Sequence, residues 1–204
     1  MTIIHCKEIV ISEIFDAHVF HTAIEAAKND GKELDKINGT FGTGLSGWFG
    51  AFVYTYPEDK YKDMRKFLTT DYLGGFCLND EDIVSVFKHP LSTQKSILNS
   101  LIPRAIQENG RRLDCFDGVL PIAYSKFDLV PVARMGFNPA YKPDDWNFAR
   151  DKSPDIIYMA YQKDQAPYKN DLNKRREWVD EVIKQLPYSS SDDVENIQKN
   201  SIIN

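Results

Sequence analysis

The sequence has no excess of positive charge and no long apolar run. Its 204 residues include 25 Lys and Arg against 30 Asp and Glu, a formal net charge of −5 at pH 7. A protein of this charge exerts no general attraction on phosphate backbones, so the composition argues against general nucleic-acid binding. No stretch reaches the roughly 18 to 20 apolar residues that cross a bilayer, so we expect no membrane partner.

Cysteine is also scarce. Cys6, Cys77 and Cys115 each lie inside an apolar run. An odd number of cysteines in such surroundings predicts buried free thiols in a reducing compartment. The N-terminal stretch MTIIHCKEIVISEI has neither the basic region nor the long apolar region of an export signal. Together these features predict a soluble cytoplasmic protein.

What is present suffices for one folded domain. Residues are 42% hydrophobic and 12% aromatic, enough to fill a core. We predict a single domain over residues 1–188 and a polar, frayed tail over 189–204. His18 and His21 lie three apart in a predicted helix, but no Cys or further His follows nearby, so we expect no metal site.

The first third of the chain predicts one strand and two helices. Residues 3–11 are rich in β-branched side chains and predict a strand. Ser12 is a suitable cap for a helix through Lys28, which Asn29-Asp30-Gly31 would end. Pro57 opens a second, short helix to about Leu68. Between them, Gly42-Thr-Gly-Leu-Ser-Gly47 superficially matches a dinucleotide loop, but an aromatic, strand-prone run follows it instead of a helix. We interpret this stretch as a lid or substrate-side loop.

The rest of the chain alternates strands with helices. Predicted strands are 72–78, 82–89, 112–117, 130–138 and 155–161, and predicted helices are 95–109, a short one around Tyr124, and 171–186. Asn79-Asp80-Glu81 is a short polar connection typical of a hairpin. Pro103 is expected to kink or restart its helix. The alternation predicts an α+β or α/β fold, a mixed sheet with helices packed on it.

Four segments carry a resemblance to a known family. They are Arg112-Leu-Asp-Cys-Phe-Asp117, Tyr124-Ser-Lys-Phe-Asp-Leu129, and the downstream pieces Tyr141–Trp146 and Pro154–Met159. In this order, after a hairpin and a helix, they resemble the GCN5-related N-acetyltransferases (GNAT superfamily), in the divergent version of bacteriophages and other mobile elements. The resemblance implies one domain with a mixed sheet of about six to seven strands, flanking helices and a C-terminal helix.

The resemblance also implies a reaction and a ligand. Strands 82–89 and 112–117 would splay apart, and their unpaired backbone groups would hold the pantetheine arm of acetyl-CoA or another acyl-CoA. The pyrophosphate would lie at the N-terminus of the following helix. The implied activity is acetyl transfer from the thioester to a primary amine of a small molecule or protein. The protein would work in the cytoplasm, that of a bacterial host if phage-encoded, and a homodimer is compatible with it.

Site residues follow from the match position by position. Tyr124 would protonate the departing thiolate, while Glu81 and His89 are candidate bases. The donor would be bound by Val84, Val86, Phe87, Lys88, Ser92, Thr93, Gln94, Lys95, Ser96 and Asp117, and the acceptor by Trp48, Phe49, Tyr54 and Trp146. Each also has a structural interpretation: Tyr124 as a core aromatic, Asp117 as a helix cap, His89 as a buried strand end.

One departure from the family keeps a second hypothesis open. The segment 89–96, His-Pro-Leu-Ser-Thr-Gln-Lys-Ser, contains no glycine where the family has a glycine-bearing pyrophosphate loop. Glycine allows a backbone to approach phosphates closely. The alternative is therefore a catalytically inactive, GNAT-like binding or inhibitory protein of a phage or mobile element.

Overall fold

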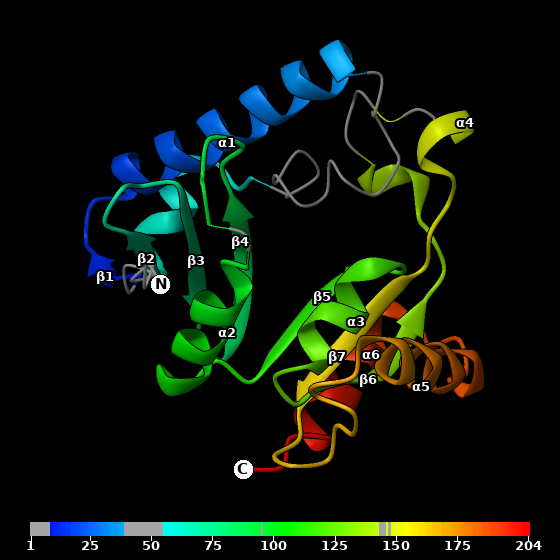
Figure 1. Ribbon diagram of the computed structural model, residues 1–204. Helices are drawn as coiled ribbons and strands as arrows, with labels where there is room; N and C mark the ends of the chain where they lie inside the picture. Colours follow the sequence, from blue (N-terminus) through cyan, green and yellow to red (C-terminus); the bar gives the residue numbers. More distant parts are fainter. Residues whose placement is uncertain (1–8, 39–54, 95, 143–145, 147) are drawn as a thin grey trace, which may run out of the picture.

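A mixed, seven-stranded sheet forms the centre of the protein (Figure 1). The computed structural model describes residues 9–38, 55–94, 96–142, 146 and 148–204. The strands are β1 (Ile11–Ile14), β2 (Arg65–Thr69), β3 (Gly74–Asn79), β4 (Asp82–Lys88), β5 (Arg112–Phe116), β6 (Leu129–Met135) and β7 (Ile156–Tyr161). Their order is β1-β2-β3-β4-β5-β7-β6, with β4 and β5 parallel and the other neighbours antiparallel. The predicted α+β fold, including the number of strands, is confirmed.

Helices cover both faces of this sheet. They are α1 (Ala17–Asn38), η2 (Glu58–Asp63), α2 (Leu98–Gln107), α3 (Val119–Ser125), η3 (Pro139–Tyr141), α4 (Phe148–Asp151), α5 (Leu172–Gln185) and α6 (Ser191–Asn200). Leu101 of α2, Ile122 of α3 and Ile183 of α5 join one buried cluster. On the opposite face, α1 packs Phe20 and Ile24 against β2, β3 and β4. None of the helices in the described ranges combines the length and apolarity that crossing a bilayer requires.

The start of the chain differs from the prediction. Ser12 lies in β1 opposite Leu68, and it is Asp16 that caps α1, since its Oδ1 accepts from the amides of His18 (2.8 Å) and Val19 (3.4 Å). The expected stop at 29–31 is also wrong, because α1 continues to Asn38. Gly31 is buried within it, and a glycine inside a helix costs only about 1 kcal/mol.

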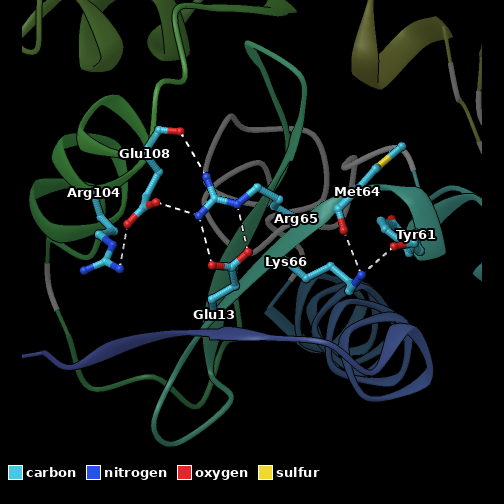
Figure 2. Close-up of polar contacts among 7 residues, drawn as sticks. All are labelled: Glu13, Tyr61, Met64, Arg65, Lys66, Arg104 and Glu108. Atoms are coloured by element: carbon cyan, nitrogen blue, oxygen red, sulfur yellow. Dashed lines mark hydrogen bonds and ion pairs between the residues drawn. The ribbon is translucent and has the colours of Figure 1, made fainter.

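The helix predicted from Pro57 to Leu68 is replaced by two elements. A 3-10 helix, η2, covers Glu58–Asp63, and the strand β2 begins at Arg65. Lys66, on the opposite side of β2 from Phe67, donates from Nζ to the carbonyls of Tyr61 and Met64, each at 2.7 Å (Figure 2). This amino group satisfies carbonyls at the end of η2 and so helps the chain leave the helix.

Two further elements differ from the prediction. Helix α2 continues through Pro103 without a restart, and buried Ile102 and Ala105 on both sides of the proline pack it against the core. The frayed tail is a helix over 191–200, α6, where Val194 and Gln198 are buried. By contrast, the β3–β4 hairpin, the free buried thiols of Cys77 and Cys115, and the strand β7 are as predicted.

Candidate functional site

Strands β4 and β5 are joined at one end and diverge at the other. The two strands pair only through Asp82 and Arg112 within the described part of the chain. At the same end, the Glu81 carbonyl accepts from the amides of Arg111 (2.7 Å) and Arg112 (3.2 Å). Figure 1 shows β4 continuing beside β3 while β5 leans away toward β7. Beyond Asp82, β5 therefore does not pair with the edge of β4 in the described part of the chain.

A bulge in β4 lies within the diverging part. Cys77 pairs with Val84 and Gly75 with Phe87, so β4 has one residue more than β3 across this interval. The extra residue is Ser85, whose φ is 53° and whose Oγ lies 3.0 Å from the Tyr61 hydroxyl on the α1 face. The bulge shifts the alternation of side chains, so that Val86 packs on the face of α2 and α3.

A cavity of about 380 Å³ opens on that face, at the far end of β4. It is bordered by the end of β4, the first residues of α2, helix α3 and the start of α5. Five of the residues predicted as site residues border it: Val86, Phe87, Lys88, Ser96 and Tyr124. The structure thus brings the end of β4, the start of α2 and the tyrosine to one hollow.

Tyr124 lies in the wall of this cavity. Its side chain is 6% exposed. Burial raises the pKa of the phenol above its ordinary value of 10, so the hydroxyl stays protonated at neutral pH. Within the described chain, no side chain or carbonyl forms a hydrogen bond with that hydroxyl. A protonated hydroxyl without a protein partner is available to donate to a ligand.

The cavity is lined by positive charge. Lys88, Lys126, Arg175 and Arg176 border it, and none of its described lining residues is acidic. This contrasts with the net charge of −5 for the whole chain. Arg175 is 7% exposed, and burial lowers the pKa of its guanidinium and that of the Lys88 amine. A hollow with this lining suits an elongated ligand that has an apolar part and an anionic part.

The predicted bases do not border the cavity. Glu81 lies at the closed end of the two strands. His89 is 6% exposed; its Nδ1 accepts from the Leu91 amide (3.1 Å) and its Nε2 lies 3.4 Å from Asp30 Oδ2. Both ring nitrogens are engaged, so the geometry favours the structural interpretation of His89.

Other predicted donor-binding residues lie outside the cavity lining. Val84 packs toward α1. Asp117 is exposed at the end of β5, where its amide donates to the Asp155 carbonyl (2.8 Å). Ser92 is buried in a turn, and Thr93 and Gln94 follow it without reaching the cavity. The prediction for Lys95 falls outside the described residues.

The predicted acceptor residues are only partly described. Trp48, Phe49 and Tyr54 lie outside the described ranges. Trp146 packs against Phe116 at the end of β5 (ring centroids 5.3 Å apart) and Phe137 after β6 (5.2 Å). This aromatic cluster is at the open end of the diverging strands, and Trp146 does not border the cavity.

Asp114 is a further candidate that was not among the predicted site residues. It lies in β5 between Leu113 and Cys115, which pack into the α2–α3 core, so its side chain points to the opposite face. It is exposed there, opposite Tyr158 of β7. Burial raises the pKa of Tyr158 to about 12. The available signal was a charged residue between two apolar ones in a predicted central strand.

No protein-family model, curated protein or solved structure matches this chain.

Proposed function

We propose that the protein is an acyl-CoA-dependent N-acyltransferase of the GNAT type, transferring an acetyl group to a primary amine of a small molecule or protein in the cytoplasm. One observation carries the proposal. Parallel strands β4 and β5 pair at Asp82–Arg112 and then diverge beside a cavity lined by basic side chains. A pantetheine arm is thin and bears amides, so it can enter the space between the diverging strands and pair with the backbone of β4 as an added strand does.

The chemistry follows from the two faces of this opening. The donor thioester would enter from the cavity, and the amine from the face that carries Asp114. The amine nitrogen attacks the thioester carbonyl carbon, the C–N bond forms and the C–S bond breaks. Asp114 accepts the proton that the amine loses, and Tyr124 donates a proton to the departing thiolate.

The proposal is tested first by donor binding. Thermal unfolding is measured with and without acetyl-CoA, since a ligand at 100 times its Kd adds about 2.7 kcal/mol to the free energy of unfolding. We expect a clear rise in Tm. No rise at millimolar acetyl-CoA would reject the acyltransferase and favour the inactive binding protein, which the glycine-free segment 89–96 supports.

The roles of two residues are tested by substitution. Tyr124→Phe should lower kcat at least about tenfold and leave acetyl-CoA affinity nearly unchanged, because the lost hydroxyl acts on the leaving group. Asp114→Asn should lower kcat and abolish its rise with pH, because an amide cannot accept the amine proton. Asp117→Asn, outside the cavity, is the matched control. Unchanged turnover in either variant would remove that residue from the mechanism.

A further inference from the structure

The segment between β4 and α2 uses its own amides internally. Leu91 donates to His89 Nδ1 (3.1 Å), Ser92 donates to the His89 carbonyl (3.0 Å), and Gln94 donates to Ser92 Oγ (3.4 Å). A phosphate-binding loop needs backbone amides that point outward and have no partner. These three amides are already satisfied, so the described part of this segment is poorly suited to cradle a pyrophosphate.

Positive charge lies instead on the other wall of the cavity. Arg175 is more than nine-tenths buried, and its Nε and Nη1 donate to the carbonyls of Ile122 (2.9 Å), Tyr168 (3.2 Å) and Lys169 (2.6 Å). No carboxylate in the described chain pairs with Arg175, and its Nη2 makes no hydrogen bond there. A buried guanidinium with a free amine on a cavity wall is a ready donor for an anion.

Two more cations flank Arg175. Arg176 follows it at the start of α5, is exposed, and forms no ion pair with the described residues. Lys126, just after α3, donates from Nζ to Asn99 Oδ1 of α2 (2.7 Å), and both residues border the cavity. Lys126 has no carboxylate partner in the described ranges either.

We infer that the phosphate groups of the acyl donor bind to side chains on the α3–α5 wall, Lys126, Arg175 and Arg176, and not to the backbone between β4 and α2. This inference rests on the proposed function. It assigns the anionic half of the donor to a site built from charged side chains. Two of them, Arg175 and Arg176, come from α5 and lie about 50 positions after Lys126 in the chain. Long charged side chains can contact the phosphates from a distance, so such a site does not need the close backbone approach that glycine would allow in segment 89–96.

The test compares ligands with and without phosphate. Isothermal titration measures acetyl-CoA and acetyl-pantetheine, which lacks the phosphates, against the wild type and Lys126→Gln/Arg176→Gln. We expect the double variant to bind acetyl-CoA about 10- to 100-fold more weakly, which corresponds to the loss of one or two charge-assisted hydrogen bonds. Its affinity for acetyl-pantetheine should be unchanged. Its acetyl-CoA affinity should also depend less on salt. Lys174→Gln, on the same helix but outside the cavity, should change neither.

The other outcomes separate the two proposals. Equal weakening of both ligands, or unchanged acetyl-CoA affinity, overturns the phosphate site while leaving the acyltransferase intact. If the wild type binds neither acyl ligand, the acyltransferase fails, and adenosine 3′,5′-bisphosphate and pyrophosphate are then titrated. Binding of these anions that the double variant loses would retain the anion site; no binding would overturn it as well.

Discussion

Asp82 and Arg112 connect β4 to β5 in two ways. In the described chain they are the one residue pair at which β4 and β5 are paired as strands. Their side chains also form an ion pair, with Asp82 Oδ2 2.8 Å from Arg112 Nη2. Arg112 is 6% exposed, and its Nη1 is also 3.5 Å from Glu195 of α6. The closed end of the proposed donor site is therefore held by a backbone pair and by an ion pair between the buried Arg112 and the half-buried Asp82.

Substitution of Arg112 should lower the free energy of unfolding far more than substitution of its exposed partner Glu195. Arg112→Met leaves the carboxylate of Asp82 without its counter-ion, so we expect a loss of about 3 kcal/mol in the free energy of unfolding. Glu195→Gln alters an exposed pair and should cost less than about 1 kcal/mol. Urea denaturation of both variants measures the difference. Equal losses would mean that the ion pair is not what holds the strands together.

The same aspartate makes stability depend on pH. Burial, only partly offset by Arg112, raises the pKa of Asp82 from 3.8 to about 6. Between pH 4 and 6 the folded protein retains this proton while the unfolded chain has released it. The folded state then binds more protons, so this group's contribution to stability falls as pH rises through that range and is constant above it.

Asp82→Asn isolates this effect. The free energy of unfolding of the wild type minus that of the variant should decrease from pH 4 to pH 6 and then level off, because other carboxylates cancel in the difference. Denaturation midpoints at several pH values give the curve. A difference that increases with pH would show that Arg112 stabilises the ionised carboxylate more than burial destabilises it.

Adjacent cations of β2 should differ in their contribution to stability (Figure 2). The Arg65 side chain is 46% exposed and binds Glu13 (2.8 Å) and Glu108 (2.6 Å), whereas Lys66 is 3% exposed and binds two carbonyls. We expect Lys66→Met to cost about 2 kcal/mol, since buried acceptors lose their donor. Arg65→Met should cost about 1 kcal/mol or less. Chemical denaturation ranks them, and the reverse order would refute the argument.

The sequence predicts elements well where the signal is local. The β3–β4 hairpin was found from the turn around Asp80, whose φ of 53° suits Asp. The segment before α1 shows the opposite case, because Phe15 fits the apolar spacing of a helix yet is 90% exposed. The helix predicted from Pro57 to about Leu68 includes residues of β2, because the alternation in Arg65–Thr69 covers only five residues and pairing with β1 and β3 decides its structure.

The candidate site also contains residues that could be predicted from the sequence and residues that could not. Val86 and Tyr124 were predicted from the resemblance, and both border the cavity. Arg175 and Arg176 belong to an otherwise ordinary polar stretch, and only tertiary packing brings α5 to the wall opposite α2. His89 resembles a catalytic base in sequence, but the amide of Leu91 occupies its Nδ1. No local pattern distinguishes an occupied imidazole from a free one.

The bulge at Ser85 offers a test of the backbone itself. Its φ of 53° is unfavourable for a residue with a Cβ, and its Oγ bonds the buried Tyr61 hydroxyl. Ser85→Ala removes the hydrogen bond to Tyr61 and keeps the backbone strain. Ser85→Gly removes the same hydrogen bond but relieves the backbone strain. We expect the glycine variant to be more stable than the alanine variant by about 1 kcal/mol.

Tyr61→Phe is the matched control, because it removes the same bond without changing β4. It should lower the free energy of unfolding by about 1 kcal/mol or more, since the hydroxyl also accepts from the Tyr56 amide (3.2 Å). Denaturation of the three variants gives the comparison. If Ser85→Gly is the least stable, residue 85 does not adopt a left-handed conformation in solution. Without that bulge, regular alternation would no longer turn Val86 toward the cavity, so the same result would also count against the donor site.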